Sequence, residues 1–211
     1  MLNMSFDKKV VIDTSKLEWQ QSPRPGVWRK PLAREEAERG HATSIVRYEP
    51  GASFSSHDHP LGEEILVLEG VFSDESGDYK AGTYFRNPEG YQHAPFSKEG
   101  CIILVKLHQF SSQDTRHVCI DTQENDWQSC HLPLHHFESE KVFMQVILEG
   151  ESVMAPEKAL GNRQGGEIYI LSGELTDGKQ SFVAGTWIRH PKILALSALK
   201  KSKLWIKTGH F

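Results

Sequence analysis

The 211-residue sequence has few cysteines, no long apolar run and no excess of basic charge. Its cysteines, Cys101, Cys119 and Cys130, are odd in number and form no C-x-x-C pair, which argues against a disulfide framework. We expect buried or partly buried free thiols in a reducing compartment. No stretch approaches the roughly 18 apolar residues of a membrane span, and the first residues lack a signal-peptide core. We therefore expect a cytoplasmic protein that does not bind membranes.

Charge and motif content narrow the function further. The 24 basic side chains are outnumbered by 28 acidic ones, which gives a net charge of -4 and disfavours direct nucleic-acid binding. The densest basic stretch, from Lys200 to Lys207, alternates with Leu204 and Ile206, which predicts a strand with a solvated face. The sequence also lacks a G-x-S-x-G elbow, a phosphate-binding glycine loop and a dinucleotide fingerprint.

An internal repeat sets the expected architecture. Gly62–Pro88 aligns without a gap on Gly165–Pro191, 103 positions later, and eleven of the 27 positions are identical. Each repeat unit is roughly 90 to 100 residues long, which exceeds a solenoid repeat and suits a small domain. We therefore predict two domains, residues 1–112 and residues 113–211.

Within each unit the pattern is one of short strands and glycine-rich turns. Glu64–Leu68 and Tyr84–Arg86 are predicted strands, Ser73–Gly82 is a predicted hairpin connection, and only Leu32–Gly40 has weak helical character. Asp74 and Asp177 occupy equivalent positions in the two units, which indicates turn geometry rather than catalysis. Many short strands in two units predict an all-β fold of two tandem jelly-roll barrels.

Four residues of the first unit form a candidate metal site. His57 and His59 are two apart, so on a strand both imidazoles face the same side. Glu63 shares that parity, whereas Glu64 does not, unless the Pro60–Gly62 turn resets the register. His93 lies beyond the hairpin, where an antiparallel neighbour would return it to the same end. Three imidazoles and one carboxylate suit zinc, iron, manganese or nickel.

The spacing of these residues carries a family resemblance. H-x-H-x3-E at His57, His59 and Glu63 is followed by G-x5-P-x-G-x2-H at Gly82, Pro88, Gly90 and His93. These spacings resemble the two motifs of the cupin superfamily. More narrowly, residues 28–107 closely resemble the cupin domain of the ChrR family of anti-sigma factors, and residues 127–205 resemble it weakly.

The resemblance implies a zinc site formed by His57, His59, Glu63 and His93, and a role in regulating a sigma factor in response to oxidative signals. One departure limits the second implication. ChrR-type regulators carry an N-terminal H-x3-C-x2-C zinc motif that binds the sigma factor, and the first 30 residues here contain no histidine or cysteine. A sigma factor is therefore a partner by resemblance only.

The second unit lacks the candidate ligands. At an offset of 103, the four ligand positions fall on Leu160, Asn162, Gly166 and Leu196. A different cluster, His131, His135 and His136 with Cys130, is an alternative site, although these side chains could equally bond to backbone or water. We expect metal only in the first unit.

Three functions remain open at this stage. The first is a regulatory or sensory metalloprotein of the ChrR type, the second a dioxygenase- or hydrolase-like cupin metalloenzyme acting on a small molecule, and the third a small-molecule binding or storage protein. Phe54, Phe85, Tyr91 and Phe96 would form either an apolar pocket beside the metal or simply barrel core. Barrel edges predict a homodimer.

Overall fold

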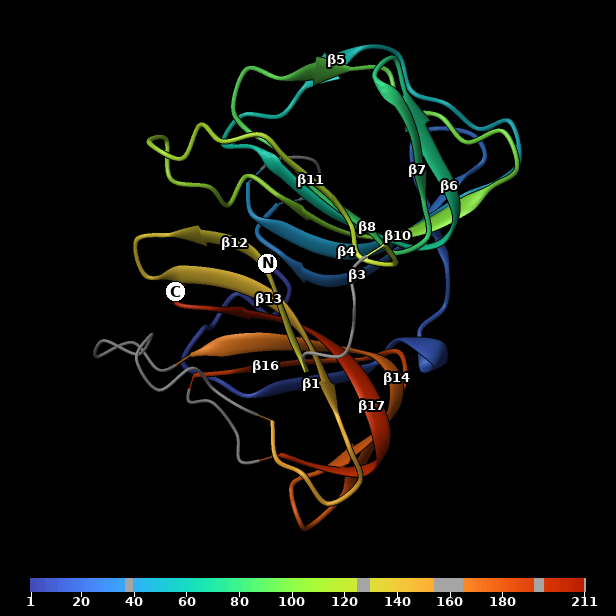
Figure 1. Ribbon diagram of the computed structural model, residues 1–211. Coiled ribbons are helices and arrows are strands. Elements are labelled where there is room, and N and C mark those ends of the chain that lie inside the picture. Colours follow the sequence, from blue (N-terminus) through green and yellow to red (C-terminus); the bar gives the residue numbers. More distant parts are fainter. Residues whose placement is uncertain (37–39, 125–129, 154–164, 192–195, 211) are drawn as a thin grey trace. The chain divides into compact units, whose positions relative to one another are not determined.

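The computed structural model describes residues 1–36, 40–124, 130–153, 165–191 and 196–210, and its regular structure is almost entirely β-strand (Figure 1). The predicted all-β class is confirmed. Two compact units are present: unit 1 comprises Met1–Met4 and Glu18–Asn125, and unit 2 comprises Ser5–Leu17 and Asp126–Phe211. Among the described residues, no helix has the length and apolar character to cross a membrane.

Unit 1 contains an eight-stranded antiparallel sheet and a two-stranded ribbon. The main path runs β11-β8-β6-β10-β4-β3-β2, with β7 paired to β6, and the ribbon is β5-β9. The strands are β2 (Gln20–Gln21), β3 (Val27–Arg34), β4 (Ala42–Tyr48), β5 (His57–Asp58), β6 (Glu63–Asp74), β7 (Gly77–Lys80), β8 (Thr83–Asn87), β9 (Gln92–His93), β10 (Cys101–Leu107) and β11 (Val118–Asp121).

The core of unit 1 follows from the alternation of side chains along these strands. Ile65 and Val67 on β6 point inward together with Ile103 and Val105 on β10. Phe72 packs edge-on against Tyr48, with ring centroids 5.6 Å apart. The alternate residue Glu64 accepts a hydrogen bond from the Tyr84 hydroxyl on the other face of the sheet.

Unit 2 contains a seven-stranded sheet of the same kind. Its path runs β1-β16-β14-β17-β13-β12, with β15 paired to β14. The strands are β1 (Val10–Asp13), β12 (His131–Phe137), β13 (Glu140–Ile147), β14 (Gly166–Thr176), β15 (Ser181–Val183), β16 (Thr186–His190) and β17 (Ser197–Thr208), and a short 3-10 turn, η1 (Thr14–Lys16), follows β1. An apolar cluster that includes Ile170, Leu175, Leu196 and Leu204 fills its interior.

The repeat found in the sequence is reproduced in the strand register. Glu64 on β6 lies opposite Arg86 on β8. The equivalent residues of unit 2, Glu167 and Arg189, lie opposite each other on β14 and β16. The identical positions of the repeat therefore mark structurally equivalent strand pairs.

A second repeated motif, which lies outside the 27-residue alignment, supplies one strand to each sheet. Residues 10–14 read VVIDT and residues 118–122 read VCIDT. The first copy forms β1, which pairs with β16 of unit 2, and the second forms β11, which pairs with β8 of unit 1. Thr14 and Thr122 each donate a hydroxyl hydrogen bond of 2.7 Å, to the carbonyls of Gly185 and Gly82 respectively.

The boundaries of the two compact units therefore differ from the predicted domain boundary after residue 112. Residues 113–125 belong to unit 1, where β11 pairs with β8, and residues 5–17 belong to unit 2, where β1 pairs with β16. Strand pairing between segments far apart in the sequence is the physical reason. The 27-residue alignment does not extend to either segment.

Three local predictions need correction. Leu32–Arg34 are the end of strand β3 rather than a helix, and residues 37–39 of that predicted helix lie outside the described residues. The C-terminal strand is confirmed, but Lys207 is buried in an ion pair with Glu140 at 3.2 Å instead of solvated. The cysteines are free as expected, and Cys101 is buried, whereas Cys119 and Cys130 are exposed.

Candidate metal centre

The first elements of the site are a short ribbon and a tight turn. His57 on β5 pairs directly with His93 on β9, which brings residues 36 positions apart side by side. His59 follows β5 immediately, and Glu63 is the first residue of β6. The predicted return of His93 to the end of the barrel that carries His57 is confirmed.

The Pro60–Gly62 turn fixes the direction of Glu63. Leu61 and Gly62 have φ values of +57° and +77°, so the turn interrupts the strand and the amide of Gly62 donates to the carbonyl of His59. A Cβ at position 62 would lie 2.2 Å from the ring of Phe110, so glycine is required there for space as well as for φ. The turn does not reverse the predicted faces: Glu63 approaches the histidines, and Glu64 lies on the opposite side of β6 with Tyr84.

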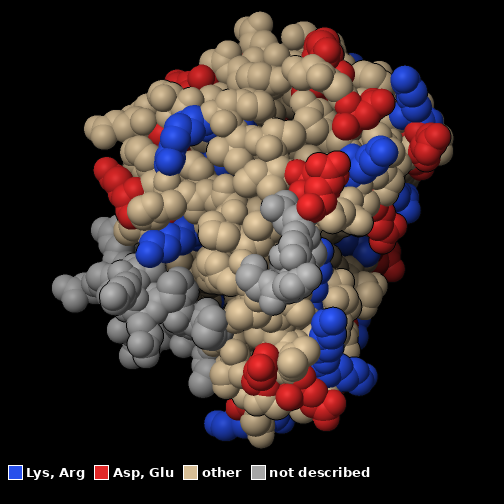
Figure 2. Space-filling view, viewed as in Figure 1, with Lys and Arg blue, Asp and Glu red and all other residues tan. Residues whose placement is uncertain are grey.

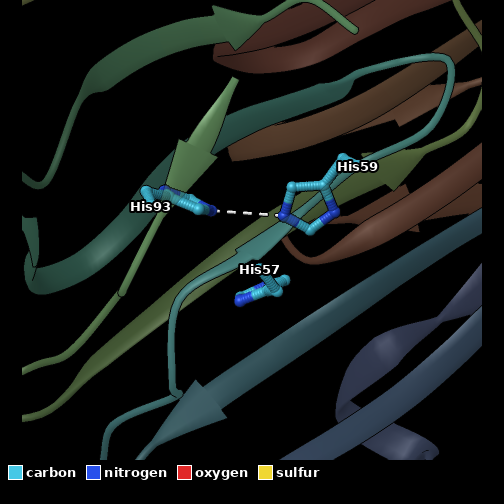
Figure 3. Close-up of side chains that lie close together, drawn as sticks. All are labelled: His57, His59 and His93. Carbon is cyan, nitrogen blue, oxygen red and sulfur yellow. Dashed lines mark hydrogen bonds between the residues drawn. The ribbon is translucent and has the colours of Figure 1, made fainter. Parts of the chain in front are cut away.

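The four predicted residues converge on one point. The Nε2 atoms of His59 and His93 lie 3.2 Å apart (Figure 3). The carboxylate of Glu63 lies between them, with Oε1 at 3.5 Å from His59 and Oε2 at 3.3 Å from His93. His57 completes the group, because one ring nitrogen from each histidine lies within 4.8 Å of the others. His59, Glu63 and His93 are buried, whereas His57 is partly exposed.

These separations fit a metal ion held by the four residues. Ligands at about 2.1 Å from a metal lie about 3.0 Å apart at right angles and about 3.4 Å apart in a tetrahedron. The observed contacts of 3.2 and 3.3 Å fall in this range, and the third, 3.5 Å, lies just beyond its upper end. The donor chemistry and the spacing both suit a divalent cation.

Protonation differs between the two buried histidines. Burial lowers the pKa of His59 and outweighs the opposing charge of Glu63. For His93, burial acts in the same direction, but the hydrogen bond to Asp74 and the charge of Glu63 outweigh it and raise the pKa. His59 is therefore ready to bind a cation at neutral pH, whereas His93 retains its proton to a higher pH in the metal-free protein.

Asp74, which its place in the repeat predicts to serve turn geometry, also contacts His93. Its Oδ2 lies 3.3 Å from Nδ1 of His93, while Oδ1 accepts from the amide of Ser76 and the hydroxyl of Tyr79. A carboxylate on the far nitrogen of a metal-binding histidine fixes the tautomer and leaves Nε2 free for the metal. The repeat hid this role, because Asp177 keeps the turn contacts, to the amides of Lys179 and Gln180, without a histidine.

A cavity of about 660 Å³ opens beside His57 and His59. Of the four aromatic residues considered in the sequence, Phe54 lines it, whereas Phe85 belongs to the apolar core. His108, which the sequence analysis did not single out, also lines it and has a φ of +58°. Such strained backbone is characteristic of functional sites. The cavity gives a small molecule access to the candidate site.

The equivalent region of unit 2 cannot hold the same group. Leu196 is fully buried in the apolar cluster, and a Cβ at Gly166 would lie 2.9 Å from the carbonyl oxygen of Lys207. The other two counterparts, Leu160 and Asn162, lie outside the described residues. A glutamate at position 166 would therefore require the adjacent strand to move.

The alternative histidine cluster is not assembled as a set. Within the described part of the chain, His131, His135 and His136 do not come together as a three-ligand group. His131 stacks on Phe143 with centroids 4.6 Å apart, and Nε2 of His136 contacts the carbonyl of Glu138 at 2.9 Å. In Figure 2, acidic and basic side chains are interspersed on the face shown.

Comparison with known proteins identifies a family for the first part of the chain. Residues 7–111 match the family model described as the ChrR cupin-like domain. A search of curated proteins finds no match. The matched segment contains all four residues of the candidate metal centre.

Solved structures share the fold at low sequence identity. A protein from Nostoc punctiforme proposed to be a dioxygenase is 15% identical, with a TM-score of 0.76 over 96% of this chain and 83% of its own. The bacterial pirin YhhW from Escherichia coli, solved with nickel(II), is 11% identical, with a TM-score of 0.73 over 95% and 98%. A cupin 2 conserved barrel domain protein from Leptotrichia buccalis is 12% identical, with a TM-score of 0.60 over 99% of each chain. The predicted pair of tandem cupin-type barrels is confirmed.

Proposed function

This chain belongs, through residues 7–111, to the family of ChrR cupin-like domains, and from that membership we propose that its first barrel binds a divalent metal through His57, His59, Glu63 and His93. The convergence of three imidazoles and one carboxylate, at separations that match ligands sharing one cation, carries the proposal. The second barrel supplies no equivalent set at Gly166 and Leu196 and serves as scaffold.

Zinc is the metal we propose first, with iron, manganese or nickel as the other candidates. Three neutral nitrogens and one carboxylate oxygen form a borderline donor set, which zinc accepts in tetrahedral geometry and the other metals accept with added water. The nickel(II) in the pirin structure supports a divalent transition metal in a barrel of this fold. Such an ion would supply positive charge that polarises a bound oxygen ligand.

The role we propose is regulatory: a metal-dependent sensory domain in transcription or the oxidative-stress response. Family membership supports this role. A sigma factor is the proposed protein partner, the cytoplasm the proposed location and a homodimer the proposed assembly. Co-purification of the metal-loaded protein with extracytoplasmic-function sigma factors tests the partner, and retention of none of them would contradict the sigma-factor proposal.

A cupin metalloenzyme is the second candidate, favoured by the cavity beside the site. Because this cavity reaches His57 and His59, a small molecule could approach the metal directly. X-ray absorption of the metal-loaded protein distinguishes the two functions. A closed shell of four protein ligands that azide leaves unchanged supports sensing, whereas an exchangeable water that azide displaces supports catalysis.

Metal content of purified variants tests the site itself. His59→Ala and Glu63→Gln should each reduce metal from one equivalent per chain to a small fraction, because three ligands leave the shell incomplete. His131→Ala in unit 2 is the matched control and should keep the full equivalent. Equal metal in His59→Ala and in the unmodified protein would contradict the assignment.

A further inference from the structure

The cavity beside the metal centre contains one permanently charged cation. Among its described lining residues, Arg29 is the only lysine or arginine. Val27, two positions earlier on β3, is fully buried in the core of unit 1, and Arg29 lies opposite the core residue Val46 on β4. Since alternate residues of a strand face the same side, Arg29 projects from the inner wall of the barrel.

The acidic side chains among the described residues of the cavity are exposed to solvent. Glu35 and Asp58 are exposed, and Glu35 accepts a hydrogen bond from the amide of His41. Solvent screens these carboxylates more than it screens the half-buried Arg29. The charge of Arg29 acts inside the barrel. Burial is the largest cause of the raised pKa of Tyr48, the charge of Glu63 raises that pKa further, and the charge of Arg29 lowers it.

The rest of the wall is largely apolar. Phe54 and Leu107 are packed against the core cluster, and Leu61 is brought to the cavity by the αL turn that precedes Glu63. Leu107 lies directly opposite Glu63 in the β10–β6 register, so this apolar surface is continuous with the metal centre. The contact between Nδ1 of His108 and the carbonyl of Pro60 assigns the proton to Nδ1. Arg29 carries the fixed positive charge among the described residues of this wall.

We propose that this cavity binds a small organic carboxylate, with its carboxylate paired to Arg29 and its apolar part against Phe54, Leu61 and Leu107. Apolar pockets of 300 to 1,000 Å³ with a few fixed polar groups are typical of small-molecule sites, and a guanidinium pairs with a carboxylate through two parallel hydrogen bonds. The inference extends the proposed metal site by naming its ligand class, and it rests on that proposal only for the proximity of the metal.

Calorimetric titration with hexanoate tests the ligand class in the metal-loaded protein. Hexanoate should bind, acetate should bind more weakly because it lacks the apolar chain, and hexylammonium should not bind because Arg29 and the metal repel it. This comparison needs no variant. Hexylammonium binding as tightly as hexanoate, or no hexanoate binding at all, would overturn the proposal.

Variants then locate the carboxylate. Arg29→Gln should weaken hexanoate binding at least tenfold and Arg29→Lys less, because only Arg29→Lys keeps a positive charge that can pair with the carboxylate. Arg47→Gln is the matched control, since Arg47 lies over the rings of Trp19 and Trp28, 4.7 and 5.7 Å from their centroids. Equal affinity in Arg29→Gln and the unmodified protein would reject the assignment.

The same samples separate this inference from the proposed function. Metal content is measured before each titration. If the unmodified protein binds no metal, the proposed function fails, and hexanoate binding that still depends on Arg29 supports the inference alone. If the protein holds metal but hexanoate affinity is independent of Arg29, the inference fails while the metal site stands.

Discussion

At the scale of single residues, Asp74 controls the orientation of His93. Its carboxylate contacts Nδ1 of His93 at 3.3 Å, so Asp74→Asn should weaken the hold on the His93 tautomer that would bind the proposed metal. We expect metal affinity to fall by about 10- to 100-fold, the usual effect of losing such a partner. Asp177→Asn is the matched control, because Asp177 makes the equivalent turn contacts and an ion pair with Lys9 at 3.2 Å. Equal affinity losses in the two variants, measured by competition with a chelator, would contradict this role.

The pH dependence of metal affinity should reflect the contact between His93 and Asp74. Protons compete with the metal for His93, whose pKa is raised above the ordinary histidine value of about 6.5. As the pH is lowered, metal affinity should therefore begin to fall at a pH that is still above 6.5. Asp74→Asn removes the charge that raises this pKa, so the fall should move to lower pH. A fall at unchanged pH in the variant, seen in titrations from pH 5.5 to 8.5, would contradict the proposed coupling.

The candidate ligands could be predicted from the sequence, but their surroundings could not. H-x-H spacing, strand parity and the hairpin were sufficient to bring His57, His59, Glu63 and His93 together. Asp74 was assigned to a turn because the repeat retains it at Asp177, and equivalence in sequence did not reveal that only one copy meets a histidine. The φ of +58° at His108 depends on tertiary contacts, which local pattern does not encode.

At the scale of elements, each sheet depends on a strand from a separate copy of the V-x-I-D-T motif. Thr14→Val removes the 2.7 Å hydroxyl bond to Gly185 in unit 2, and Thr122→Val removes the equivalent bond to Gly82 in unit 1. Each loss should cost about 1 kcal/mol, since the backbone amide still bonds the same carbonyl.

Hydrogen exchange provides the measurement for this pair of variants. Thr14→Val should deprotect β16 and leave β8 unchanged, and Thr122→Val should do the reverse. Deprotection of β8 by Thr14→Val would contradict the strand assignment. The two V-x-I-D-T strands could not be predicted from the longest alignable block of the repeat, because they are short and are related by a different offset.

At the scale of the whole molecule, removal of metal should affect the two units unequally. A ligand that binds only the folded state at a thousandfold excess over its Kd stabilises it by about 4 kcal/mol. Because all four candidate ligands belong to unit 1, chelation should deprotect residues 53–68 and 86–94 first. Deprotection centred on residues 130–136, seen by hydrogen exchange with and without chelator, would move the site to the second histidine cluster.

The proposed homodimer is tested on the same preparation. Cupin-type barrels offer sheet edges that can pair with a second copy, and in unit 1 β2 lies at the end of the sheet order. Light scattering at micromolar concentration should give about twice the chain mass of 23.9 kDa. A mass equal to one chain would contradict the dimer without affecting the metal site.

The most direct test of the central claim is anomalous X-ray diffraction from crystals of the metal-loaded protein, recorded at the absorption edge of the bound metal. We expect one strong peak per chain in unit 1, about 2.0 to 2.2 Å from one nitrogen of His57, His59 and His93 and from a carboxylate oxygen of Glu63. A metal-loaded crystal with no peak at these four residues, or with its peak beside His131 and His135, would contradict the account.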